Sequence, residues 1–297
     1  MTTTYYFRVA DFRFSVSLPA SCEVDRLLPS FHDFRETDHT MEKTLFRFTA
    51  VSSGQLPAPG SGQLIEQTDN DMGHLVLYAL RDGYYIEITS NGRLHRMAAT
   101  DDFSVIDADL QWDDPQAGSA LSSLIRTAYA QAILYHNAIS IHASAVHNNG
   151  RAYLFMGKSG TGKSTHSALW MEHIPDTELL NDDNPTIRIW EGKAYAYGTP
   201  WSGKTPCYKN QAFPIEGMAR LRQAPENRFD KLEGIDAFIA LYPGCSVITH
   251  DEHLRNRLYD TLTLLAEKVT VGTMDCLPDR EAALTCHDAL TNKYKNK

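Results

Sequence analysis

The chain has 297 residues, and its 28 Lys and Arg against 37 Asp and Glu give a formal net charge of −9 at pH 7. An acidic surface repels phosphate backbones and anionic lipid, which argues against nucleic acid and membranes as partners. No apolar run approaches the roughly 18 residues of a membrane-spanning helix. Hydrophobic residues make up 42% of the chain, as in a globular protein with a substantial core.

The cysteines indicate a reducing compartment. They are odd in number and widely scattered, without a C-x-x-C pair: Cys22, Cys207, Cys245, Cys276 and Cys286. This pattern argues against both a disulfide framework and a zinc knuckle. The opening MTTTYYFRVADFRF lacks the basic segment and apolar stretch of a secretion signal. We therefore expect a cytoplasmic protein.

Residues 1–113 are predicted to form a smaller, β-rich domain. Segments rich in β-branched and aromatic residues alternate with turn signals such as SSG, RDG and SNG. These segments cover 5–16, 44–51, 74–80 and 84–89. The most linker-like stretch, PAPGSG, is short enough to be a loop within this domain.

From residue 114 the pattern becomes a mixture of helices and strands. Helical spacing of apolar residues predicts helices over 116–136, 164–173, 249–269 and 279–290. The third of these opens with Thr249 and Glu252 in capping-box spacing. Strands are predicted at 138–147, 151–156, 177–183, 235–243 and 270–277, with a hairpin at 185–198. The expected class is mixed α+β, with a helix-covered mixed sheet over 114–297.

GKSGTGKS (157–164) satisfies the Walker A, or P-loop, pattern G-x-x-x-x-G-K-[ST]. A predicted strand precedes it and a helix-like segment follows, as a phosphate loop requires. The backbone N–H groups of such a loop point at phosphate oxygens, and its lysine neutralises the β- and γ-phosphates. The pattern therefore predicts bound ATP and Mg²⁺, with GTP or pyrophosphate as other possible donors. The predicted nucleotide contacts are Gly157, Ser159, Gly160, Thr161, Gly162, Lys163, Ser164, Thr165 and Lys204.

An acidic pair ends the strand predicted after the loop, in LLNDDNP. We assign Asp182 as the general base toward an acceptor hydroxyl, and Asp183 with Ser164 as the ligands of Mg²⁺. The order within the pair can be reversed. The alternative is that NDDNP is only a turn, since Asn, Asp and Pro all favour turns.

Two further segments are candidates for the site. In ISIHASAV, strand alternation places Ser140, His142 and Ser144 on one face, which could line a cleft. His142 is thus a candidate catalytic residue beside Asp182 and Lys163, although a lone strand histidine is more often structural. In GTPWSGKTP, Trp201 offers an apolar wall and Lys204 a cation, unless this is an ordinary surface loop with a buried tryptophan.

Four ordered segments resemble the catalytic domain of HPr kinase/phosphorylase and its relatives, a group that includes ATP-type phosphoenolpyruvate carboxykinases. They are IHASAV, YLFMGKSGTGKST, LNDDNP and YGTPWSGK. The resemblance covers roughly residues 116–290. It implies that His142, Lys163 and Ser164 match the family's strand histidine and loop residues, and that Asp182–Asp183 match its aspartate pair. The family's metal-binding Glu has no counterpart in AYGTPWSGK, and the β-rich first domain differs from the usual HPr kinase one.

The motifs and the resemblance predict a kinase that transfers the γ-phosphate of ATP to a hydroxyl, with Mg²⁺. The acceptor is a small molecule, a peptide or a protein. Because HPr kinases are hexameric, the resemblance also implies possible self-assembly. Two alternatives stay open. One is a carboxykinase-like lyase, which needs a second metal site and a basic pocket for a dicarboxylate. The other is a nucleotide-gated binding module that hydrolyses ATP slowly.

Overall fold

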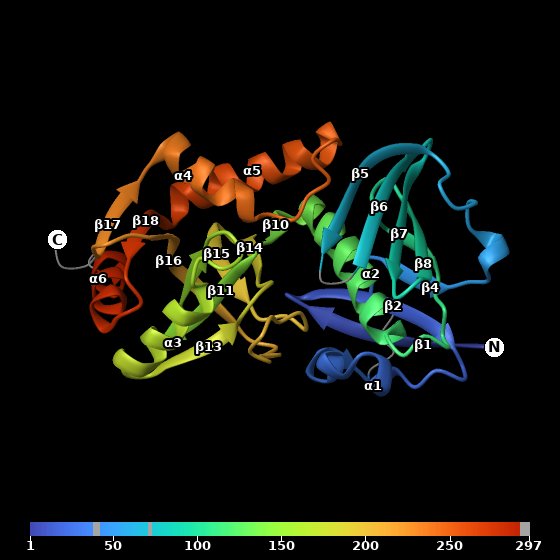
Figure 1. Cartoon of the computed structure of the whole chain (residues 1–297), viewed down its shortest axis with the longest axis horizontal. Coiled ribbons are helices and arrows are strands. Elements are labelled where there is room, and N and C mark those ends of the chain that lie inside the picture. Colours follow the sequence, from blue (N-terminus) through green and yellow to red (C-terminus); the bar gives the residue numbers. More distant parts are fainter. Residues whose placement is uncertain (38–41, 71–72, 292–297) are drawn as a thin grey trace. The chain divides into compact units, whose positions relative to one another are not determined.

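The computed structural model describes residues 1–37, 42–70 and 73–291. The chain divides into two compact units, Met1–Tyr135 and His136–Lys297. Each unit contains a large mixed sheet with helices, which confirms the predicted mixed α+β class (Figure 1). Within the described ranges, no helix has both the length and the apolar character needed to cross a membrane.

The first unit is built on a nine-stranded sheet in the order β3-β1-β2-β4-β9-β8-β7-β6-β5. Its strands are β1 (Thr2–Val9), β2 (Phe12–Pro19), β3 (Arg35–Glu36), β4 (Arg47–Ala50), β5 (Gln63–Asn70), β6 (Gly73–Leu80), β7 (Gly83–Ser90), β8 (Arg93–Thr100) and β9 (Val105–Asp109). Its helices are α1 (Val24–Leu27), α2 (Ala117–Ala132) and the 3₁₀ turns η1 (Pro29–Phe34), η2 (Ser53–Gln55) and η3 (Ile133–His136).

The predicted strand segment 5–16 is two strands, β1 and β2, joined by a tight turn. The turn residues Ala10 and Asp11 have φ of 50° and 63°. Positive φ at both central positions is the geometry of a type I′ hairpin turn, which matches the twist of the flanking strands. Ala-Asp lacks the Asn-Gly or Asp-Gly signature of such turns, so the sequence alone did not indicate it.

The helix predicted over 116–136 is confirmed as α2, but it belongs to the first unit, whereas the predicted domain boundary followed residue 113. α2 lies close against α1: a Cβ added at Gly118 would come within 2.5 Å of the carbonyl oxygen of Leu27. The ring of Tyr129 in α2 lies 6.3 Å from that of Phe14 in β2. Burial of these apolar side chains fixes α2 to this unit, a contact that residue spacing does not reveal.

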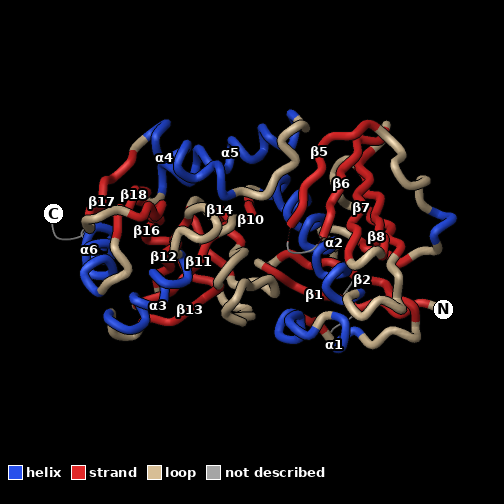
Figure 2. The backbone as a smooth tube through the Cα atoms, in the orientation of Figure 1, coloured by secondary structure: helices blue, strands red, loops and turns tan. Residues whose placement is uncertain are grey.

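The second unit contains a nine-stranded sheet with helices on both faces (Figure 2). Its strands are β10 (Ala138–Ser140), β11 (Ala143–Asn148), β12 (Arg151–Met156), β13 (Thr177–Asn181), β14 (Thr186–Trp190), β15 (Lys193–Tyr197), β16 (Ala212–Gln223), β17 (Arg228–Leu232) and β18 (Thr270–Cys276). Its helices are α3 (Lys163–His173), α4 (Gly234–Leu241), η4 (Tyr242–Gly244), α5 (Glu252–Lys268) and α6 (Arg280–Thr291).

Strand directions gather the sequence motifs at one edge of this sheet. β16 lies between β12 and β18 and runs parallel to both. β11 is antiparallel to β12 and to β13, so β13 runs in the same direction as β12. The carboxyl ends of β13, β12, β16 and β18 therefore share an edge with the start of β11. In open sheets that contain parallel strands, this is the edge at which ligands bind.

The core beneath the edge holds α3 in place. Trp170 on α3 is fully buried against Tyr153 and Phe155 of β12. Burial lowers the pKa of His166 to about 4, so its ring is neutral at neutral pH. The Nε2 atom of His166 then accepts a hydrogen bond of 3.1 Å from the indole of Trp170. The start of α3, where Lys163 lies, is thus fixed relative to β12.

The prediction of a strand at 235–243 is wrong, because this segment forms the helix α4 followed by η4. Ala237, Ala240 and Leu241 are buried, whereas Ile235 and Ile239 are 68% and 59% exposed. A short apolar run fits a buried strand and a buried helix equally well by periodicity. The long strand β16, in the middle of the sheet, was also missed, since Pro214 and Gly217 interrupt its apolar pattern.

The helix predicted over 249–269 is confirmed as α5, but its cap differs from the predicted one. The side chain of Asp251, and not that of Thr249, accepts a hydrogen bond of 2.8 Å from the backbone N–H of Leu254. An N-cap carboxylate at this position satisfies a backbone donor that otherwise lacks an intrahelical partner.

Replacing Asp251 by alanine should lower the free energy of unfolding by about 1 kcal/mol through loss of this cap. The matched change Thr249→Ala should stay within about 0.5 kcal/mol of the wild type. Urea unfolding followed by circular dichroism measures both. A larger loss of stability in Thr249→Ala than in Asp251→Ala would instead support the capping box predicted from the sequence.

Candidate active site

The phosphate-loop residues form a turn between β12 and α3, as the pattern predicts. Gly160 and Gly162 have φ of 80° and 107°, in the left-handed region that favours glycine. Thr161 closes the turn with its N–H and its hydroxyl, which both donate to the carbonyl oxygen of Lys158. Ser164 and Thr165 are exposed in the first turn of α3. The loop therefore has the curl and the helix N-terminus that favour phosphate binding.

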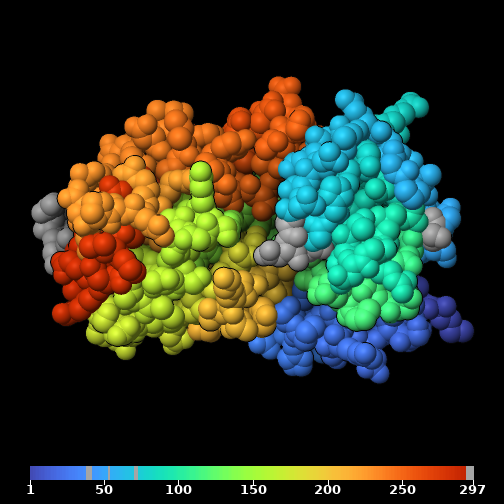
Figure 3. Space-filling model, viewed as in Figure 1, coloured from blue at the N-terminus to red at the C-terminus, as the bar shows by residue number. Residues whose placement is uncertain are grey.

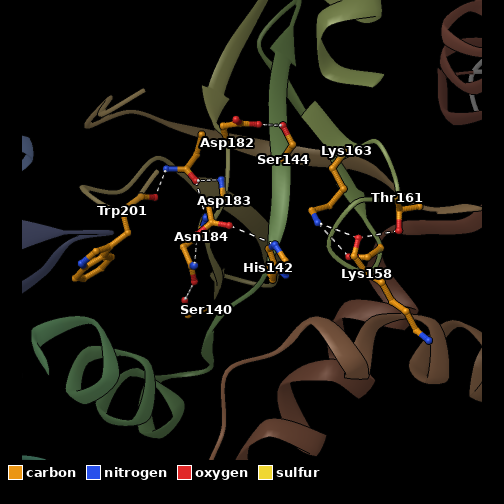
Figure 4. A network of polar contacts seen from close by, with 12 residues as sticks. Ser140, His142, Ser144, Lys158, Thr161, Lys163, Asp182, Asp183, Asn184 and Trp201 are labelled. Atoms are coloured by element: carbon orange, nitrogen blue, oxygen red, sulfur yellow. Dashed lines mark hydrogen bonds and ion pairs between the residues drawn. The ribbon is translucent and has the colours of Figure 1, made fainter. Parts of the chain in front are cut away.

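Lys163 lies over the inside of this loop. Its side chain is largely buried, and Nζ donates to the carbonyl oxygens of Gly157 and Lys158 at 3.2 and 3.4 Å (Figure 4). Burial lowers the pKa of Lys163, while the carboxylates of Asp183 and Asp182 act in the opposite direction. The loop, the lysine and the acidic pair thus belong to one electrostatic site.

The alternating face of the histidine segment lies along the acidic turn. The Ser144 hydroxyl donates to Asp182 Oδ1 at 3.0 Å, and the Ser140 hydroxyl donates to the side-chain oxygen of Asn184 at 2.9 Å. Between them, His142 Nε2 lies 3.3 Å from Asp183 Oδ1 (Figure 4). The three side chains expected on one face therefore meet three consecutive residues of the turn.

The predicted strand 138–147 is interrupted at His142, between β10 and β11. The N–H of His142 donates to the carbonyl oxygen of Gly244 at 2.7 Å, and the N–H of Ala143 donates to that of Asp183 at 3.0 Å. The side chain of His142 is 42% exposed. His142 is thus fixed by its backbone, while its ring is open to solvent beside the acidic pair.

The two aspartates have different surroundings. Asp182 is 5% exposed, and both of its oxygens accept hydrogen bonds, Oδ1 from Ser144 and Oδ2 from the N–H of Thr205 at 3.2 Å. The side chain of Asp183 is 26% exposed and faces His142, and its Oδ2 accepts from the amide of Asn184 at 2.9 Å. Asp183 is therefore the more accessible carboxylate of the pair.

Asn181 connects the acidic turn to the following loop, and the sequence had not singled it out. Its Oδ1 accepts from the backbone N–H groups of Asp183 and Asn184 at 3.0 and 2.8 Å. Its amide nitrogen donates to the carbonyl oxygens of Thr199 and Trp201 at 3.3 and 3.0 Å. The sequence signal for this role is the Asn directly before the acidic turn, because Asn side chains often form hydrogen bonds with the backbone two residues further along the chain.

The loop GTPWSGKTP lies against the acidic pair, but Trp201 does not form the expected wall. Its side chain is 5% exposed and points away from Asp183 and Lys163 (Figure 4). Gly203 allows a close approach, since a Cβ there would lie 2.9 Å from the carbonyl oxygen of Asp182. Lys204 is exposed at the tip of this loop, and within the described part of the chain it forms no hydrogen bond or ion pair with the predicted nucleotide contacts of the phosphate loop.

The residues present fit a magnesium ion that arrives with phosphates. Among the described residues, no group of three or more His, Cys, Asp or Glu side chains could hold a metal ion. Ser164 and Asp183 offer only oxygen atoms, the ligands that Mg²⁺ prefers. Magnesium is commonly held by one or two protein oxygens together with substrate phosphates and water, and not by an all-protein cage.

Among the solved structures similar to this chain is the one described as the HPr(Ser) kinase/phosphatase from Coxiella burnetii. It shares 10% sequence identity with this chain at a TM-score of 0.30, and the match covers 52% of this chain and 95% of that one. No family model and no curated protein matches the sequence. A likeness this weak does not define a function, so the roles proposed below rest on the residues themselves.

Proposed function

We propose that the second unit is an ATP- and Mg²⁺-dependent phosphotransferase that acts on a hydroxyl group. The observation that carries the proposal is the phosphate loop with Lys163 inside it, placed beside the partly exposed pair of Asp183 and His142. Phosphoryl transfer needs charge stabilisation and in-line positioning more than covalent chemistry. The loop can bind and stabilise the phosphates of the donor, and the neighbouring carboxylate can position the acceptor hydroxyl and take its proton.

In this proposal the loop N–H groups and Lys163 bind the triphosphate. Ser164 holds Mg²⁺ together with phosphate oxygens, and the acidic pair contributes directly or through water. The ion supplies charge neutralisation at the phosphates. These are the same residues that the loop pattern predicts for donor and metal.

The surroundings of the two aspartates support the reversed order of the pair. Asp183 takes the proton of the acceptor hydroxyl, and His142 orients it or shares the proton. Asp182 holds the loop through the N–H of Thr205. A carboxylate that is only 5% exposed is poorly placed to meet a substrate, whereas a general base must come within hydrogen-bond reach of it.

The test is transfer of label from γ-³²P-ATP with Mg²⁺ into a desalted small-molecule pool and, separately, into a protein extract. Label that appears in one of these fractions would establish a kinase and identify the class of acceptor. Label released only as inorganic phosphate, at one slow rate with or without either fraction, would contradict the kinase. That result would favour the nucleotide-gated binding module.

A further inference from the structure

The strand ends at the ligand-binding edge form a row with the phosphate loop inside it. On one side of the loop lie His142, before β11, and Asp183, after β13. On the other side lie the carboxyl ends of β16 and β18, where Gln223 is paired with Cys276. Neighbouring strands are about 4.8 Å apart, so β18 ends roughly 10 Å from β12.

The position of the acidic pair sets the direction of a bound nucleotide. For transfer, the γ-phosphate must face Asp183 and His142. The rest of the donor then extends from the loop toward the opposite side of the row, over β16 and β18. A distance of about 10 Å is one that an α-phosphate and a ribose can span.

An apolar surface lies at that end of the row. Leu277, directly after β18, is 40% exposed, although it is a large hydrophobic residue. Pro278, the next residue, and Pro225, two residues after β16, are also exposed. In the space-filling view, the red surface of the C-terminal segment borders the orange surface of the segment after β16 (Figure 3). The surface combines residues that are about 50 positions apart in the sequence.

Hydrogen bonds fix Leu277 in this exposed position. Its N–H donates to Oδ1 of Asn227 at 2.9 Å, and the amide nitrogen of Asn227 donates to Asp279 at 2.9 Å. Asp279 also accepts from the N–H of Ala282 at the start of α6. The amide of Gln223 contacts the phosphate loop, 3.4 Å from the carbonyl oxygen of Gly160. Leu277 is thus held in place by hydrogen bonds, and Gln223, at the end of the neighbouring strand β16, contacts the phosphate loop.

We propose that Leu277, with Pro225, Pro278 and Gln223, binds the base and ribose of the donor. The donor is then a nucleoside triphosphate and not a bare polyphosphate. This inference rests on the proposed function, since it requires phosphates in the loop. Ligand sites commonly combine apolar side chains with a few polar groups that set orientation, and this surface offers both.

The test compares binding of ATP and of inorganic tripolyphosphate, each with Mg²⁺, by isothermal titration calorimetry. The wild type should prefer ATP. The change Leu277→Ser should weaken ATP binding by about tenfold, which corresponds to about 1.4 kcal/mol, and leave tripolyphosphate binding unchanged. Ile235→Ser is the matched control, since Ile235 is an exposed residue on α4, and it should change neither affinity.

Other outcomes separate this inference from the proposed function. If the wild type binds tripolyphosphate as tightly as ATP, or if Leu277→Ser leaves ATP binding unchanged, the nucleoside surface is wrong while the phosphate loop stands. An equal loss for both ligands in Leu277→Ser would also overturn it, because the effect would then lie at the phosphates. Binding of neither ligand by the wild type would overturn both proposals.

Discussion

Replacing Lys163 by alanine should reduce phosphoryl transfer by about 10²–10³-fold, the effect of removing one preorganised charge-stabilising group. Nζ of Lys163 lies over the carbonyl oxygens of Gly157 and Lys158, where the phosphates are expected. The variant loses the one loop side chain that neutralises them. Transfer of ³²P from ATP, at saturating Mg²⁺, measures the change.

Lys158→Ala is the matched control, since this lysine belongs to the same loop but is exposed. It should retain most of the activity. Lys163→Met keeps the apolar stem and so separates loss of charge from loss of packing, because the stem of Lys163 is buried. Both Lys163 variants should show this reduction of about 10²–10³-fold and remain folded by circular dichroism. Full activity in a folded Lys163→Met variant would falsify the assigned role.

Asp183→Asn should reduce kcat by about 10²–10⁴-fold, the typical contribution of a positioned general base. The change keeps the size of the side chain, and the amide oxygen can still accept a hydrogen bond from Asn184. Steady-state kinetics with the acceptor identified by the labelling experiment gives kcat and KM separately.

Asp182→Asn should behave differently, because the neutral amide oxygen accepts more weakly than a carboxylate from the N–H of Thr205, while the amide nitrogen can still bond to the Ser144 hydroxyl. The hydrogen bond from Thr205 is weakened, the loop after β15 loosens, and the main expected effect is a higher KM for the acceptor. If Asp182→Asn instead lowers kcat more than Asp183→Asn does, the order expected from the sequence is correct and Asp182 is the base.

The sequence was sufficient wherever a local rule decides the structure. The phosphate loop follows from glycine conformations and the strand–helix context. The helices α2 and α5 follow from apolar residues at helical spacing. Alternation along 139–146 placed Ser140, His142 and Ser144 on one face, and all three meet the acidic turn.

Contacts between distant segments decided the rest. The identity of α4 depends on which side chains the neighbouring elements bury, and periodicity in a short apolar run does not reveal this. The burial of Asp182 depends on Ser144 and Thr205, which lie 38 and 23 residues away. The exposed position of Leu277 depends on Asn227, 50 residues before it.

The sequence by itself therefore determined which residues could carry the chemistry: a phosphate loop, a histidine strand and two aspartates. Only the tertiary structure distinguished the two aspartates, turned Trp201 away from the site and placed Gln223 beside the phosphate loop. The physical reason is that loop curl and strand alternation are set by neighbouring residues. Burial and hydrogen-bond partners instead depend on how separate strands and loops come together, which no local pattern encodes.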